Sequence, residues 1–207
     1  MIVGVDSSTT MIKTARARVH DAKESRADCQ LGDIYNLDFS DKTFDGCRAD
    51  RIFHHLDRPE QALQELVRVT KPGGRIVLFD PDFDASVIAA TDQDVTRRVI
   101  HMISDRVLAG SDARNHAARM QRVGLSNILV IPKTFLFLDY ELGERLLGIE
   151  DAVHRLVQQA AIDLAAATAW LEELKQRNQR KAYLSMITGF TVAGQKPTDN
   201  RLSLPMP

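Results

Sequence analysis

The amino-acid sequence predicts an α/β fold in which a mainly parallel sheet is covered by helices on both faces. Short apolar runs that suit buried strands alternate with segments whose apolar residues recur at helical spacing. Residues 75–80 are apolar enough to be covered on both faces, as strands of parallel sheets are. The predicted strands of the first part are residues 2–6, 27–31, 44–49 and 75–80.

Two helices are predicted between these strands. Apolar residues recur with a helical period through residues 11–20 and again through 59–70. Pro59 suits the first turn of the second helix, where its missing N–H donor costs nothing. The turn Lys71-Pro72-Gly73-Gly74 ends that helix. A strand followed by a helix and a further strand implies a parallel crossover.

The pattern changes after residue 80, where long helical segments dominate. We expect helices over 84–108, 114–123 and 142–179, and strands over 124–131, 135–138 and 183–193. We expect one domain over residues 1–197, with a helical cap or lid at 84–123 and 142–180 and a flexible tail at 198–207.

The composition favours a small-molecule partner in the cytoplasm. The net charge of -1 over 207 residues offers no field for attracting nucleic acid or an anionic membrane. Cys29 and Cys47 lie in strand-like runs, so neither a disulfide framework nor a metal site is expected, which indicates a reducing compartment. The sequence contains no signal-peptide pattern at its start and no apolar window long enough to span a membrane.

Two acids follow predicted strands at the same presumed edge of the sheet. In doubly wound folds, an acid in the position of Asp6 can accept hydrogen bonds from a ribose. The alternative is that Asp6, with Ser7, caps the next helix. Asp33 can accept a hydrogen bond from an adenine amino group, or it can be a polar turn residue.

The pair His54 and His55 follows a strand at the edge where ligands bind in such folds. Either imidazole can take a proton from a hydroxyl acceptor at neutral pH, so both are candidate catalytic residues. The alternative is that one of them caps a helix or packs beneath a loop. His101 and His116 are weaker candidates, because isolated helical histidines are usually surface residues.

Three further charged residues have two interpretations each. Asp80 and Asp82 follow a predicted strand end. They either face the substrate that accepts a transferred group or serve only as turn residues. Arg48 reaches either a carboxylate or the solvent.

An ordered set of motifs resembles a known family. The motifs are Val3-Gly4-Val5-Asp6-Ser7, Gly32-Asp33, Phe44-Asp45, His54-His55-Leu56, Lys71-Pro72-Gly73-Gly74 and the closing segment 188–197. Together they resemble the class I S-adenosylmethionine-dependent methyltransferases of the ubiquinone-biosynthesis type, which have a Rossmann-like fold. The resemblance covers roughly the first 80 residues closely and the middle helices only in outline.

The resemblance implies a binding site for the cofactor S-adenosyl-L-methionine. Asp6 would hold the ribose hydroxyls and Asp33 the adenine amino group, whereas no residue is implied as a metal ligand. The implied cofactor-binding residues are Asp6, Ser7, Met11, Asp33, Ile34, Ala49 and Asp50.

The family places its first strand and glycine-rich loop before the segment that begins here, and nothing of that kind precedes Ile2. Three explanations stay open: a late start, a remnant that has lost activity, or another chain that supplies the strand. A homodimer and a strand-complementing partner are the protein partners to consider. An absent central strand would leave backbone groups unpaired, at about 1–3 kcal/mol for each one that is buried.

The predicted function is S-adenosylmethionine-dependent transfer of a methyl group to a small organic acceptor. This displacement mainly requires alignment of the acceptor and exclusion of water. Two alternatives from other classes remain: a noncatalytic binding or regulatory protein on a degenerate methyltransferase scaffold, and an NAD(P)-dependent oxidoreductase, in which Asp6 would hold a nucleotide ribose.

Overall fold

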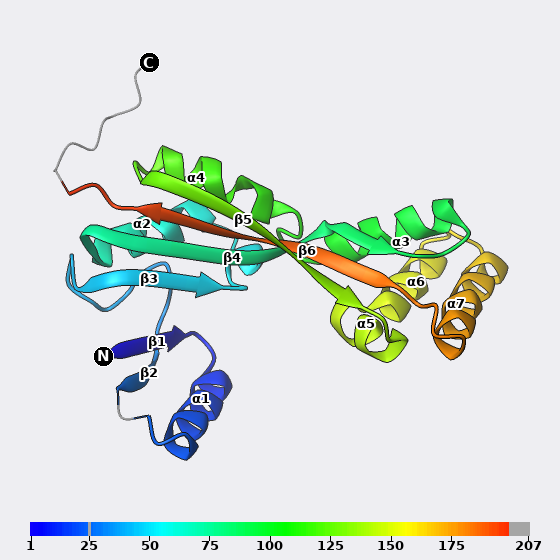
Figure 1. Ribbon diagram of the computed structural model, residues 1–207, viewed down its shortest axis with the longest axis horizontal. Helices are drawn as coiled ribbons and strands as arrows, with labels where there is room; N and C mark the ends of the chain where they lie inside the picture. The colour runs from blue at the N-terminus through cyan, green and yellow to red at the C-terminus, as the bar shows by residue number, and fades with distance from the viewer. Residues whose placement is uncertain (25, 199–207) are drawn as a thin grey trace.

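A computed structural model describes residues 1–24 and 26–198 and has a mixed α/β fold, as predicted (Figure 1). The predicted tail at 199–207 lies outside the described residues. The elements are β1 Ile2–Asp6, α1 Thr9–Asp21, β2 Ala27–Leu31, β3 Phe44–Asp50, η1 Phe53–His55, α2 Pro59–Val69, β4 Thr70–Ile88, α3 Gln93–Asp105, η2 Asp112–Asn115, α4 His116–Arg122, β5 Ser126–Phe137, α5 Tyr140–Leu147, α6 Ile149–Gln158, α7 Leu164–Gln179 and β6 Ser185–Gln195.

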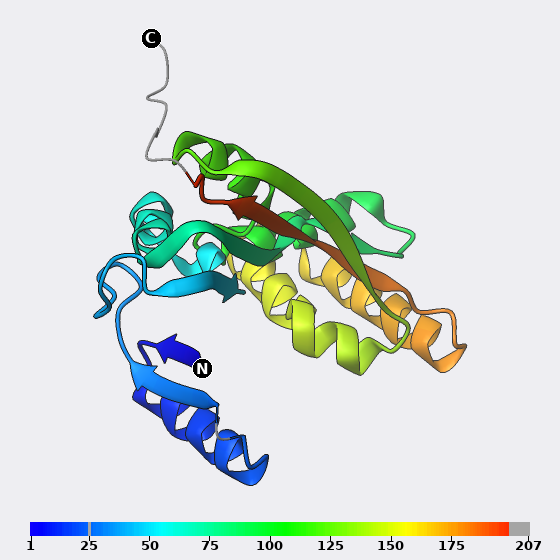
Figure 2. The same cartoon turned by 60° about the vertical axis from the view of Figure 1, so that its left-hand side comes forward.

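The strands form two separate hydrogen-bonded groups. β1 pairs in parallel with β2, and α1 joins them, as the sequence predicts for a crossover. The second group has the order β3-β4-β6-β5, in which β3 is parallel to β4 and β6 is antiparallel to both neighbours. Figure 2 shows β1, β2 and α1 standing apart from the four-stranded sheet. The chain from β2 to β3 connects the two groups.

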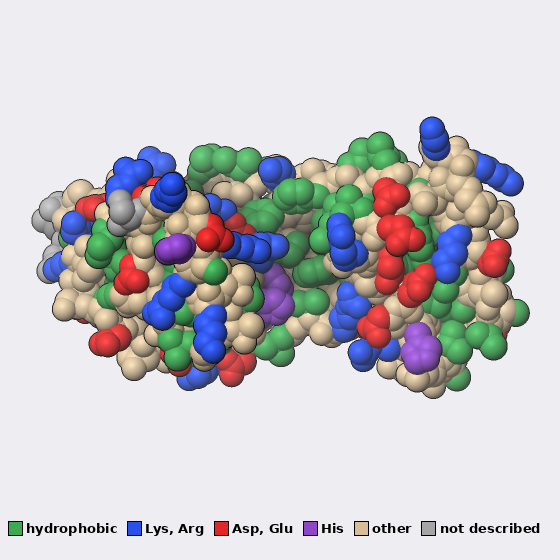
Figure 3. Space-filling view, turned by 90° about the horizontal axis from the view of Figure 1, so that it is seen from below, with side chains coloured by type: hydrophobic (Ala, Val, Ile, Leu, Met, Phe, Trp, Pro, Cys, Tyr) green, Lys and Arg blue, Asp and Glu red, His purple; other side chains and the backbone are tan. Residues whose placement is uncertain are grey.

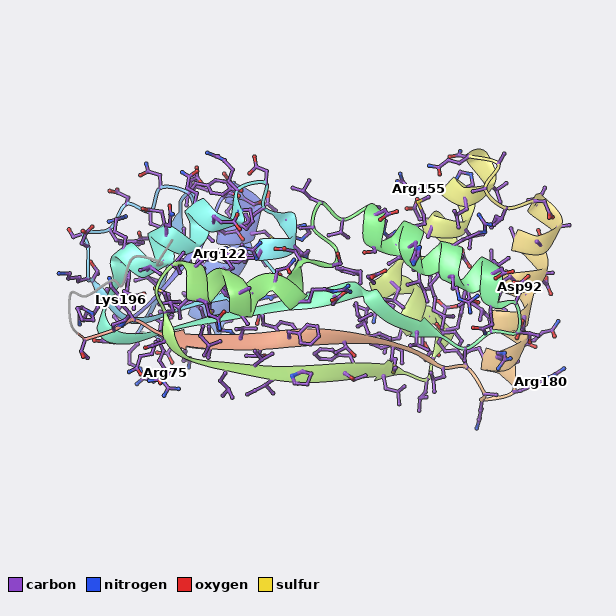
Figure 4. The ribbon with its side chains drawn as sticks, turned by 90° about the horizontal axis from the view of Figure 1, so that it is seen from above. Arg75, Asp92, Arg122, Arg155, Arg180 and Lys196 are labelled. Atoms are coloured by element: carbon purple, nitrogen blue, oxygen red, sulfur yellow. The ribbon has the colours of Figure 1, made fainter. Side chains whose placement is uncertain are left out.

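Two hydrophobic cores divide the molecule into lobes. The sheet lobe, whose core includes Phe53, Leu63, Ile76 and Met120, contains β3, α2, α4 and the adjoining parts of β4 and β6. The cap lobe, whose core includes Trp170, contains α3, α5, α6, α7 and the distal parts of β4 and β6. Figure 4 shows α2 and α4 together along one face of the long strands, with α3 continuing this layer over the cap lobe. The long strands therefore connect the two lobes.

The predicted cap range 84–123 is divided between these lobes. Its first part contributes α3 to the cap lobe, whereas α4 packs on the sheet through Met120, which is fully buried in the core of the sheet lobe. The range 142–180 is helical, as predicted, and forms the rest of the cap lobe. Gly148, with a φ of 63°, takes the left-handed conformation that separates α5 from α6.

The prediction of a helix from residue 84 is wrong at its beginning. β4 continues to Ile88, because Val87 and Ile88 pair with Met186 and Ser185 of β6. The helix α3 begins only after Asp92, whose side chain accepts hydrogen bonds from the backbone N–H groups of residues 94 and 95. Figure 4 shows Asp92 at the far end of the cap lobe.

The two strands predicted at 124–131 and 135–138 are one continuous strand, β5. Pro132 does not interrupt it, since β5 is the edge strand of its sheet and pairs only with β6 in the described residues. A proline in an edge strand can direct its missing donor away from the ladder. The predicted break therefore does not occur.

Candidate active site

A cavity of about 940 Å³ separates β1 from β3. Residues of both strands line it. The lining also includes Leu66 of α2 and Val77 of β4. Most of the predicted cofactor residues lie on its wall: Asp6, Ser7, Asp33, Ile34, Ala49 and Asp50.

Asp6 stabilises the turn before α1 and also lines the cavity. Its Oδ1 accepts a hydrogen bond of 2.7 Å from the backbone N–H of Ser8, which is the N-cap residue of α1. Its other carboxylate oxygen forms no hydrogen bond within the described residues, and the residue lines the cavity. One oxygen thus stabilises the strand-to-helix turn, and the second is free to accept a donor from a ligand.

Asp33 is arranged in the same way. Its Oδ1 accepts a hydrogen bond of 2.9 Å from the backbone N–H of Tyr35, which forms a tight turn after β2. Ile34 and Tyr35 also line the cavity. The Tyr35 hydroxyl donates to Asp57 at 2.5 Å, and the Arg58 guanidinium lies over the tyrosine ring, 4.2 Å from its centre. Tyr35 is not predicted from the sequence, because no local pattern indicates its contacts with Asp57 and Arg58.

The third part of the wall comes from the end of β3. Ala49 is buried, whereas Asp50 forms ion pairs with Arg48 and Arg51. Both interpretations of Arg48 therefore apply. Its guanidinium forms an ion pair with a carboxylate of its own strand, and its side chain is 69% exposed to solvent.

Two of the predicted site residues do not line the cavity. The side chain of Met11 lies on α1 and is 55% exposed. His54 lies beneath the cavity wall, whereas His55 is on it. The centres of the His54 and His55 rings lie 3.9 Å apart, and the ring planes are tilted by 50°. Figure 3 shows histidine and hydrophobic side chains together between the two lobes.

A buried carboxylate, Asp80, holds His54 from below. The Nδ1 atom of His54 lies 2.5 Å from Oδ1 of Asp80, and the Nε2 atom of His116 lies 2.9 Å from Oδ2. Burial raises the pKa of the Asp80 carboxyl, but hydrogen bonds from His116 and His54 outweigh it and hold this pKa below its usual value. Asp80 is therefore ionised and holds one histidine with each oxygen.

Three interpretations of the sequence need correction here. His116 is fully buried and not a surface residue, because Asp80 accepts its hydrogen bond and Phe53 packs against its ring. Asp80 and Asp82 do not follow a strand end but are buried positions within β4, and Oδ1 of Asp82 also accepts a local hydrogen bond of 3.2 Å from the backbone N–H of Ala85. His101, in contrast, is exposed as predicted.

Arg119 is a further member of this buried cluster that is not predicted from the sequence. Its Nη1 donates to Nδ1 of His116 at 3.2 Å, while its other nitrogens donate to Glu60 and Asp112.

No cluster in the described part of the chain is arranged to hold a metal ion. None of its helices has the length and apolar character needed to cross a membrane.

Comparisons with known proteins agree with this architecture. A methyltransferase domain family matches residues 1–78. An uncharacterized 37.1 kDa protein of transposon TN4556 from Streptomyces fradiae is 32% identical over 174 residues, which are 84% of this chain and 50% of that protein. The chain thus spans half the length of this relative.

Two solved structures share the fold. The YcgJ protein of Bacillus subtilis superposes with a TM-score of 0.64 at 19% identity, over 94% of this chain and 82% of that one. Phosphoethanolamine N-methyltransferase 2 of Haemonchus contortus, solved in complex with S-adenosyl-L-methionine, has a TM-score of 0.55 at 21% identity, over 94% and 43% of the two chains.

The described residues share the Rossmann-like α/β fold of these structural neighbours. Residues 1–78 match the methyltransferase domain family, so the first part of the chain is similar to that family.

Proposed function

We propose that this chain binds S-adenosyl-L-methionine between β1 and β3 and takes part in transferring its methyl group to a small organic acceptor. The observation that carries the proposal is the pair Asp6 and Asp33, each of which uses one carboxylate oxygen for a backbone turn and keeps the other free at the cavity. A nucleoside offers hydroxyl and amino donors that suit two such acceptors.

The lining of the cavity fits the remaining parts of this cofactor. Ile34 presents an apolar surface beside Asp33, which suits packing against an adenine ring. Ala49 and Asp50, at the end of β3, also line the cavity and are the residues that would lie beside the methionine part. When bound, the cofactor supplies a methyl group on a positively charged sulfur, which is displaced in line by the acceptor.

The chain's own residues then align the acceptor, exclude water and receive its proton. His55 on the wall and His54 beneath it are the candidate proton acceptors. The hydrophobic side chains between the two lobes (Figure 3) favour an acceptor with apolar surface.

The test is titration calorimetry of the chain with S-adenosylhomocysteine. Asp6→Asn keeps an oxygen for the Ser8 N–H group but removes the charge that faces the ligand. We expect roughly micromolar binding by the natural sequence. The substitution should weaken it by roughly 10–100-fold, since hydrogen bonds to charged groups contribute about 1.5–3 kcal/mol.

Ser8→Ala is the matched control, because it removes the cap of α1 without touching the cavity. It should leave the affinity nearly unchanged. A chain that is folded by circular dichroism but binds no S-adenosylhomocysteine would contradict the proposal and favour a noncatalytic scaffold. If binding is found, acceptors can be screened by the release of S-adenosylhomocysteine from S-adenosyl-L-methionine.

A further inference from the structure

The hydrogen bonds around Asp80 assign a protonation state to each buried histidine. An arginine side chain carries only donors, so the Nδ1 atom of His116 must be the acceptor of its contact with Arg119. This nitrogen therefore carries no proton. The other nitrogen, Nε2, then carries the proton and donates it to Asp80. His116 is fixed as a neutral imidazole with both nitrogens in use.

His54 differs from His116 in one respect. Its Nδ1–H group donates to Asp80, and its backbone N–H also approaches the same oxygen, at 3.4 Å. Its Nε2 atom forms no hydrogen bond in the described residues. Nor is Nε2 among the fully buried polar atoms there that lack a partner, so it keeps some contact with solvent. His54 is thus the member of the cluster that can accept a proton.

We propose that Nε2 of His54 is the proton-accepting atom of this site and that Asp80, His116 and Arg119 are positioning residues that hold it in this state. The inference rests on the proposed function for its catalytic meaning. In methyl transfer, a bond forms between the acceptor atom and the methyl carbon, and the pair of the broken carbon–sulfur bond stays on sulfur. The acceptor's proton passes to Nε2 of His54 and from there to solvent.

The charges of the cluster favour this direction of proton transfer. Asp80 is fully buried and Asp112 is nearby, whereas Arg119 is the fixed cation between Asp112 and Glu60. A proton on His54 would pair with the carboxylate of Asp80 across the existing 2.5 Å contact. Because Nδ1 of His116 already accepts a hydrogen bond from Arg119, it is not available for this proton. The positive charge therefore forms on His54.

The first experiment reads the tautomers directly in the full chain by long-range ¹H–¹⁵N NMR of ¹⁵N-histidine. The natural sequence should show His54 protonated on Nδ1 and His116 on Nε2 in the neutral state. His55→Gln should leave both unchanged, because His55 has no hydrogen bond to the cluster in the described residues. A proton on Nε2 of neutral His54 would overturn the proposal without any substitution.

The second experiment measures carbethoxylation of each histidine by diethyl pyrocarbonate, located by mass spectrometry. His54 should react at Nε2, and His116 should be protected. Asp80→Asn should slow the reaction of His54 by roughly tenfold or more, since the charged partner that fixes its tautomer is lost. Arg119→Met should instead make His116 able to take up a proton, whereas Arg119→Lys, which keeps a donor, should restore the natural state.

An unreactive His54 in the folded chain would also overturn the assignment. These readouts do not depend on methyl transfer. Failure of S-adenosylhomocysteine to bind would therefore count against the proposed function alone, while a wrong tautomer would count against the proton acceptor alone.

Discussion

Asp82 accepts two hydrogen bonds, each of 2.7 Å, from the guanidinium group of Arg114. The carboxylate is 1% exposed and belongs to the part of β4 that passes from the sheet lobe to the cap lobe. Arg114 comes from η2, between α3 and α4, so the pair links β4 to the connection between the lobes. The same guanidinium also contacts Asp84 at 3.2 Å.

Arg114→Ala is expected to destabilise the protein, because it leaves the buried Asp82 without its cation. Loss of one partner of a buried ion pair costs about 3–5 kcal/mol. Since the Arg114 side chain is 47% exposed, water can partly replace it, and we expect a loss of about 2–3 kcal/mol. The measurement is the free energy of unfolding in urea.

Arg97→Ala provides the matched comparison, since its pair with Asp94 is exposed on α3. It should change the free energy of unfolding by less than about 0.5 kcal/mol. Equal effects of the two substitutions would show that the Asp82 pair does not stabilise the junction.

Local patterns in the sequence were sufficient for the first part of the fold. The strands at 2–6 and 27–31 and the helix beginning at Pro59 agree with the structure, because each depends on its own apolar periodicity and capping residues. The extension of β4 beyond residue 80 could not be predicted in this way. It depends on pairing with β6, which lies about 100 residues later in the chain.

The same distinction applies to the site. Asp6 and Asp33 could be found because strand ends and turns mark them locally. His116 could not, since its burial depends on Asp80, 36 residues away, and on Arg119, whose helix packs on the sheet. A histidine on a short polar helix gives no local sign that a buried carboxylate accepts its hydrogen bond.

In the cap lobe, we predict that the hydrogen bond between the buried indole of Trp170 and the hydroxyl of Thr96 stabilises the folded state. Its Nε1–H donates to Oγ1 of Thr96 at 3.0 Å, between α7 and α3. Thr96→Val keeps the shape but leaves the indole donor unsatisfied, so unfolding should become easier by about 1–3 kcal/mol. Trp170 is the single tryptophan of the chain, so its fluorescence during urea unfolding reports on this lobe.

Thr168→Val is the control for this substitution. Its hydroxyl donates to the carbonyl of Leu164 within the same helix and is exposed. The expected change is within about 0.5 kcal/mol. If Thr96→Val also left the free energy of unfolding unchanged, the hydrogen bond between the two helices would make no net contribution to stability.

His55 is predicted to stay uncharged at neutral pH. Burial lowers the pKa of its imidazole, and repulsion from the neighbouring His54 ring lowers it further when that ring carries a proton, although Asp80 opposes both. A neutral His55 keeps the cavity wall free of positive charge beside the proposed sulfonium ligand. The midpoint, followed by the NMR signal of its Cε1 proton, should lie below that of the chain unfolded in urea, which is about 6.5.

The sign of the linked effect on stability follows from the lowered pKa. The folded state binds a proton at His55 less readily than the unfolded state, so its contribution to stability is present above about pH 6.5 and is lost as the pH falls through the folded value. His54→Gln removes the imidazole whose protonation opposes a charge on His55, so it should raise the midpoint of His55. A midpoint that moved down, or one already above the unfolded reference, would contradict the expected coupling between the two neighbouring rings.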